Sequence, residues 1–174
     1  MPSKPLIIVI TGPCGVGKTT IVNLLAEELD FSVISGDKLK DELFPQLSII
    51  TQFPEKLNSL KQLIFERSRE AFQHGDSIII DYVILGKSYI ETYQKEFGTN
   101  LLFKVLFPSI KVALERDSKR DCWTSGREVI EHLYERFGSL KEIIGAENYL
   151  DTSGKSALET SKILLQEINN LPNS

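Results

Sequence analysis

The chain has 174 residues, of which 25% are charged and 41% hydrophobic, and its formal net charge is −4. These values are ordinary for a water-soluble globular protein, and the length fits a single domain over residues 1–174. The net acidity argues against sequence-independent binding to nucleic acid, which needs an excess of Lys and Arg. The apolar runs have the length of strands, which excludes a membrane-spanning helix.

Apolar segments and helical patterns alternate along the chain. In chain order, we expect strands at residues 6–11, 32–35, 77–81, 101–107 and 148–151. Between and after them, helices are expected at residues 19–29, 38–43, 55–74, 87–97, 110–119 and from 156 or 157 to about 170. Most of the strands are unbroken apolar runs, as in parallel sheets that helices cover on both faces. The pattern predicts an α/β fold, a three-layer P-loop NTPase architecture with a five-stranded parallel sheet.

The first loop of the chain carries its most specific motif. Residues 12–19 match the pattern G-x-x-x-x-G-K-[ST] in full, between a predicted strand and a predicted helix. Glycines let successive backbone N–H groups turn toward phosphate oxygens, and the positive end of the helix favours the same anion. Lys18 can reach the β- and γ-phosphates, and the Thr19 hydroxyl can hold Mg²⁺. We therefore expect ATP to bind at Gly12, Pro13, Cys14, Gly15, Val16, Gly17, Lys18, Thr19 and Thr20.

Two acidic residues follow the second and third predicted strands, at the sheet edge where such folds bind ligands. Asp37 is placed to orient or deprotonate an attacking hydroxyl, and its alternative role is to cap the following helix. Asp81 is placed to bind Mg²⁺ directly or through water, or to hold the substrate. Its alternative is a solvated strand end.

Three arginines are candidates for contacts with phosphates. Arg116 and Arg120 are four residues apart and share a helix face, and Arg127 follows a polar stretch that contains glycine. Guanidinium groups suit the oxygens of a phosphoryl group in transfer, and a mobile segment can carry them over ATP. We expect a small lid at about residues 117–127, because such a segment can close over ATP and open again to release the product. The alternative is a solvated helix of mixed charge.

Together these segments resemble the small P-loop kinases of metabolism and antibiotic resistance, which include shikimate kinase-like, gluconate kinase-like and chloramphenicol phosphotransferase-like proteins. The resemblance is carried by residues 12–19, by Gly36 and Asp37, by the Arg116-x-x-x-Arg120 pair and by residues 151–153. It implies that Arg116 packs on adenine, that Arg120 contacts phosphates, and that Thr152 lines the adenine pocket.

The chain departs from these relatives on the acceptor side. Shikimate kinases carry Asp-x-Asp after the second strand, where this chain has Ser35 in the first position. Residues 81–86 do not reproduce their glycine-rich substrate loop, and look closer to the chloramphenicol phosphotransferase-like group. The acceptor is therefore left open by the sequence.

The expected function is transfer of the γ-phosphate of ATP, with Mg²⁺, to a hydroxyl of a small molecule, with Lys18, Asp37 and Arg120 as catalytic residues. The alternatives are a nucleotide or nucleoside kinase, or a nucleotide-dependent switch that is not a kinase. The segments Asn-Lys-x-Asp of GTPases and Leu-Ser-Gly-Gly-Gln of ABC ATPases do not occur in the chain.

Residues 1–5 lack the apolar region of a secretory signal, and Cys14 and Cys122 are interpreted as free thiols. We expect a cytoplasmic monomer or homodimer.

Overall fold

The computed structural model of the chain describes residues 4–47, 50–119 and 124–171. Its strands are β1 (Ile7–Thr11), β2 (Ser32–Ser35), β3 (Ile78–Asp81), β4 (Leu101–Leu106) and β5 (Tyr149–Leu150). They pair in parallel in the order β2-β3-β1-β4-β5. The predicted α/β fold with a five-stranded parallel sheet is confirmed.

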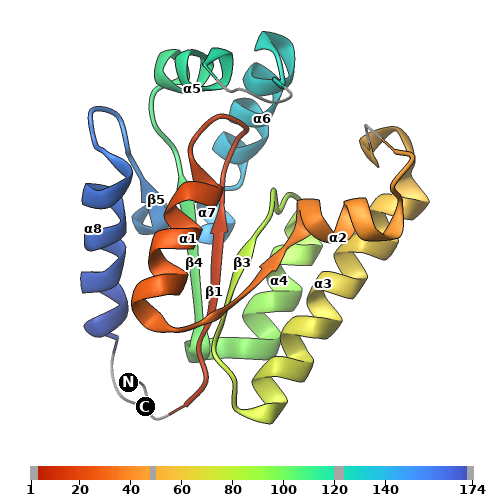
Figure 1. Ribbon diagram of the computed structural model, residues 1–174, viewed down its shortest axis with the longest axis vertical. Helices are drawn as coiled ribbons and strands as arrows, with labels where there is room; N and C mark the ends of the chain where they lie inside the picture. The colour runs from red at the N-terminus through yellow and green to blue at the C-terminus, as the bar shows by residue number, and fades with distance from the viewer. Residues whose placement is uncertain (1–3, 48–49, 120–123, 172–174) are drawn as a thin grey trace.

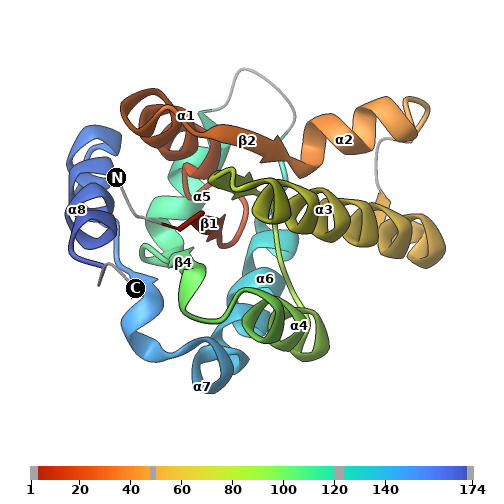
Figure 2. The ribbon, with the colours of Figure 1, turned by 90° about the horizontal axis from the view of Figure 1, so that it is seen from below.

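Helices cover both faces of this sheet (Figures 1 and 2). α1 and α8 lie side by side on one face, and α3 and α4 lie on the other, whereas α5 and α6 stand beyond the carboxyl ends of the strands. The helices are α1 (Lys18–Leu29), α2 (Gly36–Leu43), α3 (Pro54–His74), α4 (Lys87–Phe97), α5 (Ile110–Ser118), α6 (Arg127–Ser139), α7 (Lys141–Ile144) and α8 (Ala157–Asn169). Short 3-10 turns are η1 (Ile50–Gln52), η2 (Gly98–Asn100) and η3 (Ala146–Asn148).

The central strand β1 divides the core into two clusters. Ile7 and Val9 belong to the cluster under α3 and α4, and Ile8 and Ile10 belong to the cluster under α1 and α8. Successive side chains of a strand point to opposite faces, so a strand covered on both faces is apolar throughout. All residues of β1 are buried, and this holds the loop that follows β1 on a fixed support.

Most predicted boundaries agree with the structure to within two residues. The helix expected at residues 87–97 is α4, and the strand expected at residues 32–35 is β2. The pattern does not delimit α6, although Ile130, Leu133 and Phe137 form its buried stripe. Part of the lid expected at 117–127 lies outside the described residues, so this lid stays a prediction. Within the described part of the chain, no helix has the length and apolar character needed to cross a membrane.

Candidate functional site

The loop between β1 and α1 holds the side chain of its own lysine. Lys18 Nζ donates hydrogen bonds to the carbonyl oxygens of Gly12, at 3.1 Å, and Pro13, at 2.8 Å. Gly17, which precedes α1, has the left-handed backbone that glycine adopts without strain. The ammonium group therefore lies inside the curl of the loop, and α1 begins there with its positive end. This geometry would suit phosphate oxygens, and phosphate binding by the loop stays a prediction of the motif.

A second part of the site joins the loop to the neighbouring strand. Thr19 Oγ1 donates a hydrogen bond of 2.7 Å to Asp81 Oδ2 at the end of β3. β3 pairs with β1, and Ile10 lies opposite Asp81 in the register, so the carboxylate lies beside the start of the loop. Two residues 62 positions apart in the chain are thereby brought into contact.

Asp81 is in an electrostatic setting that suits a cation. Burial raises the pKa of its carboxyl group, and the nearby negative charge of Asp37 raises it further. The Thr19 hydrogen bond and the positive charge of Lys18 act in the opposite direction. Mg²⁺ binds in proteins through one or two carboxylates together with phosphate oxygens and water. Thr19 and Asp81 fit such an ion, which would also relieve the repulsion between the two carboxylates.

Asp37 lies in the first turn of α2 and is exposed. The helix is capped by Ser35, whose hydroxyl accepts a hydrogen bond from the Lys38 backbone N–H, at 3.4 Å. The alternative interpretation of Asp37 as the cap is therefore wrong, and its carboxylate is left available. Ser35 lies opposite Asp81 in the pairing of β2 with β3, which places the start of α2 beside the Thr19–Asp81 pair.

The ring of Tyr82 packs under the start of α2. A Cβ atom on Gly36 would lie 2.0 Å from Tyr82 Cδ2, so only glycine fits beside this ring. Tyr82 is buried, and burial together with the charge of Asp37 raises the pKa of its phenol. The glycine therefore lets the start of α2, which carries Asp37, lie close against the aromatic ring.

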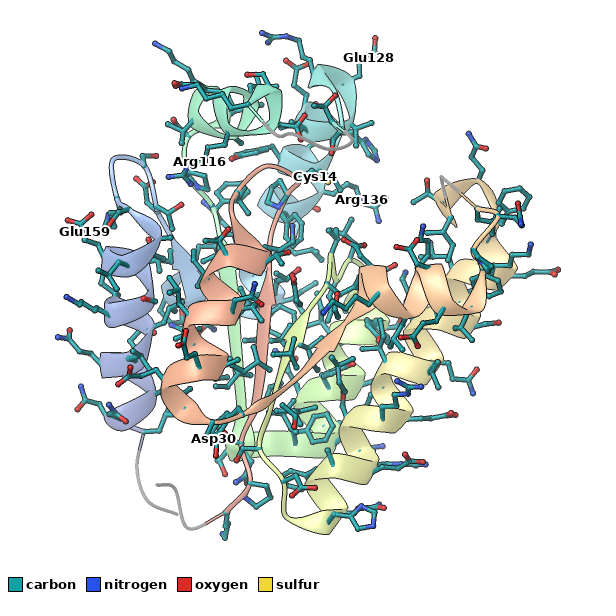
Figure 3. The ribbon with its side chains drawn as sticks, viewed as in Figure 1. Cys14, Asp30, Arg116, Glu128, Arg136 and Glu159 are labelled. Atoms are coloured by element: carbon teal, nitrogen blue, oxygen red, sulfur yellow. The ribbon has the colours of Figure 1, made fainter. Side chains whose placement is uncertain are left out.

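Arg116 joins the phosphate loop to the segment after β5. Its Nη1 donates to Val16 O and Thr152 Oγ1, both at 3.2 Å, and its Nη2 donates to Thr152 O at 3.0 Å and Lys155 O at 3.2 Å. The structure thus brings together Arg116, Thr152 and the loop, three of the predicted nucleotide contacts. Figure 3 shows Arg116 and Cys14 at the same end of the molecule, beyond the strands.

Of the other two predicted arginines, only Arg127 lies among the described residues. Arg127 is exposed at the start of α6, and its Nη1 forms an ion pair of 3.0 Å with Glu131 on the same helix. Its described partner is therefore a surface carboxylate, and a role at the phosphates stays a prediction. Arg120 and Cys122 lie outside the described residues.

Two cations, on α3 and α6, were beyond the reach of sequence patterns. Lys61 on α3 is half-buried, and its pKa is lowered by burial and by the positive charge of Arg136 on α6. Lys61 Nζ lies 5.9 Å from the centre of the Tyr89 ring, and the Tyr89 hydroxyl donates to Lys61 O at 2.6 Å. Figure 3 shows Arg136 extending from α6 toward the side on which α2 and α3 lie. Among the described residues, neither cation has a carboxylate within ion-pair distance.

Comparison with known proteins identifies the family of the chain. The AAA_33 family, described as an AAA domain, matches residues 7–131, which include β1, the phosphate loop, α1, Asp37 and Asp81. The chain belongs to this family. A probable adenylyl-sulfate kinase of Archaeoglobus fulgidus is 28% identical over 121 residues, which cover 65% of this chain and 74% of that protein.

Solved structures of two kinases share the fold. A gluconokinase from Sinorhizobium meliloti has a TM-score of 0.68 at 19% identity and covers 96% of this chain and 93% of its own. A shikimate kinase from Acinetobacter baumannii, in complex with shikimate, has a TM-score of 0.68 at 17% identity, over 98% of this chain and 97% of its own. At these identities the likeness shows the fold alone. The predicted resemblance to gluconate and shikimate kinases is confirmed at that level.

Proposed function

We propose that this AAA_33 protein transfers the γ-phosphate of ATP, with Mg²⁺, to a hydroxyl group of a small molecule. The observation that carries the proposal is the contact between Thr19 and Asp81, with the charge of Asp37 beside it. In this proposal the phosphate loop, the Mg²⁺ site at Thr19 and Asp81, and the exposed Asp37 lie at one end of the sheet. The kinases named among the relatives support the same class of reaction.

Each residue has a physical role in this proposal. Lys18 leaves the loop carbonyls to neutralise the β- and γ-phosphates, and Arg116 and Thr152 border the nucleotide on the other side of the loop. Mg²⁺, when bound, neutralises the charge that develops on the transferred group. Asp37 orients the acceptor hydroxyl or takes its proton. Arg120 stays a predicted contact of the transferred phosphoryl group.

The Lys61–Arg136 pair supports an acceptor that carries an anionic group. Burial lowers the pKa of Lys61, and the positive charge of Arg136 lowers it further, because two like charges in a half-buried setting repel each other. A carboxylate or phosphate between them would turn repulsion into attraction, with charge-assisted hydrogen bonds from both sides. Besides burial, the charge of Asp37 raises the pKa of Tyr82, and Tyr82 raises the pKa of Tyr89, whose hydroxyl donates to Lys61 O. A nucleotide kinase, whose acceptor is itself a phosphate, is the second candidate on the same observation.

A panel of hydroxylated metabolites tests the function. ADP release from Mg-ATP would be measured with neutral sugars, hydroxylated carboxylic acids, nucleosides, nucleoside monophosphates and aromatic antibiotics. The proposal expects strong stimulation by one acceptor, and by an anionic one in preference to its neutral analogue. Slow hydrolysis that no acceptor stimulates would favour the nucleotide-dependent switch instead.

A further inference from the structure

Asp117, near the end of α5, is a buried carboxylate whose bonds tie it to α6. Its side chain is 3% exposed, which is rare for an acid without compensating hydrogen bonds. The backbone N–H of Ser125 donates to Oδ2 at 2.9 Å and Oδ1 at 3.2 Å, and that of Gly126 donates to Oδ2 at 3.3 Å. The N-cap residue of α6 is Gly126, which has no side chain to cap the helix. A carboxylate from α5 therefore does so.

The other side of Asp117 rests on the phosphate loop. A Cβ atom at Gly15 would lie 3.0 Å from Asp117 Cβ and 2.5 Å from Ala113 O, so the loop backbone lies directly against α5. Gly15 also has a φ of +78°, which disfavours any side chain there. The adjacent Arg116 donates to Val16 O. Two neighbouring residues of α5 thus hold two neighbouring residues of the loop.

The start of α6 and the phosphate loop are consequently aligned on the same turn of α5. Ser125, in the segment that Asp117 holds, also has a buried hydroxyl oxygen without a hydrogen-bond partner among the described residues. A buried hydroxyl without a hydrogen bond lowers the stability of the folded protein. The Ser125 side chain therefore does not stabilise this segment, whereas the hydrogen bonds to Asp117 do. α6 carries Arg136, the proposed partner of an acceptor anion.

We propose that Asp117 is a positioning residue: it holds the start of α6 at a fixed place on the phosphate loop, so that Arg136 meets the acceptor in register with ATP. The inference rests on the proposed function for its effect on catalysis, but its structural part does not. A carboxylate is suited to the task because it accepts several N–H bonds at once, whereas an amide of the same shape presents an N–H₂ group to one of the donors.

The test compares Asp117→Asn with Glu115→Gln, a charge-removing control on the exposed face of the same helix. Hydrogen–deuterium exchange of the backbone amides at residues 125–126 is measured with and without a Mg-bound nonhydrolysable ATP analogue. The affinity for the analogue and kcat with the acceptor are measured beside it. Asp117→Glu, which keeps the charge and lengthens the side chain, replaces Asp117→Asn if that variant does not fold.

The proposal expects faster exchange at residues 125–126 in Asp117→Asn and a kcat that falls by about tenfold to a hundredfold. The affinity for the analogue should stay within about threefold of that of the parent, because misplacement of a side chain acts chiefly on the transition state. Glu115→Gln behaves as the parent. Unchanged exchange at residues 125–126 overturns the inference. So does an equal loss of affinity and kcat that follows a lowered melting temperature. If the parent binds the analogue but transfers phosphate to no acceptor, the proposed function fails, and the exchange measurement still decides the role of Asp117.

Discussion

Thr19 and Asp81 are joined by a hydrogen bond of 2.7 Å between the hydroxyl of the phosphate loop and the carboxylate at the end of β3. The contact links the first turn of α1 to the strand beside β1. Burial raises the pKa of this carboxyl group, and Thr19 and Lys18 offset part of that effect because both favour its charged form. In the proposed function the pair receives Mg²⁺ with the phosphates.

Replacement of Asp81 by Asn is expected to raise the Mg²⁺ concentration needed for half-maximal activity. The amide keeps the shape of the side chain but loses the charge that attracts the ion. We expect an increase of about tenfold or more, in line with the effects of changes around metal ligands. Magnesium titrations of phosphate transfer at saturating ATP measure it. Asp76→Asn, at an exposed acid before β3, is the matched control, and an unaltered magnesium curve for Asp81→Asn would contradict the assignment.

Asp37→Asn should lower kcat for phosphate transfer far more than it changes the affinity for ATP. The structure assigns the helix cap to Ser35, so the loss of the Asp37 charge leaves α2 in place. A fall in kcat of about a hundredfold or more is expected for removal of a group that handles the acceptor proton. Steady-state kinetics and nucleotide titration provide the two numbers. Equal losses in both would indicate that Asp37 serves the fold or the nucleotide instead.

Lys61→Met is expected to raise KM for an anionic acceptor while KM for ATP stays near its original value. Loss of a charge-assisted hydrogen bond corresponds to about tenfold to a hundredfold in affinity. Lys162→Met, at an exposed lysine of α8 on the opposite face of the sheet, is the control. Both variants are compared on the anionic acceptor and on its neutral analogue. An equal increase in KM for the neutral analogue and for the anionic acceptor would refute the electrostatic role.

The same pair predicts a dependence on pH. Burial and the charge of Arg136 lower the pKa of Lys61, so the free enzyme loses this positive charge at a lower pH than an ordinary lysine does. Binding of an anionic acceptor should be strongest below that pKa and weaken as pH rises through it, in a range below the pKa of an ordinary lysine. Acceptor KM measured across this range checks the sign. Lys61→Arg, which stays charged, should give a flat profile, and a parent profile just as flat would count against the pair.

Gly36→Ala should destabilise the fold, because the added Cβ would lie 2.0 Å from the Tyr82 ring. Overpacking of this kind lowers the free energy of unfolding by about 1–3 kcal/mol. Gly138→Ala, in α6, is the control, since a Cβ there meets nothing within 4 Å and alanine favours helices. Denaturant unfolding of the two variants measures the difference. Equal stabilities would show that the ring moves aside without loss.

The sequence predicts the parts of this protein that depend on local patterns. The apolar runs of β1 and β3 fix the sheet, and the motif at residues 12–19 fixes the phosphate loop, because each requires particular residues at adjacent positions. Asp37 and Asp81 are predicted as site residues by the rule that ligands lie at the carboxyl ends of parallel strands.

Residues that act across the fold leave no such pattern. Lys61 and Arg136 are 75 positions apart on different helices, and only the packing of α3, α4 and α6 brings their charges together. Asp117 lies among alternating charges in α5, where its sequence surroundings resemble those of a solvated helix. Its burial against Gly15 depends on where the loop rests, which spacing does not reveal.

The most direct test of the account is to identify the phosphorylated product. The protein would be incubated with Mg-ATP carrying a labelled γ-phosphate and with the acceptor that stimulates ADP release, with Lys18→Ala as the control. The account predicts that the label appears on a hydroxyl of the acceptor, seen as a mass gain of one phosphoryl group, and that Lys18→Ala abolishes it. Label found only in inorganic phosphate, with every acceptor recovered unchanged, would contradict it.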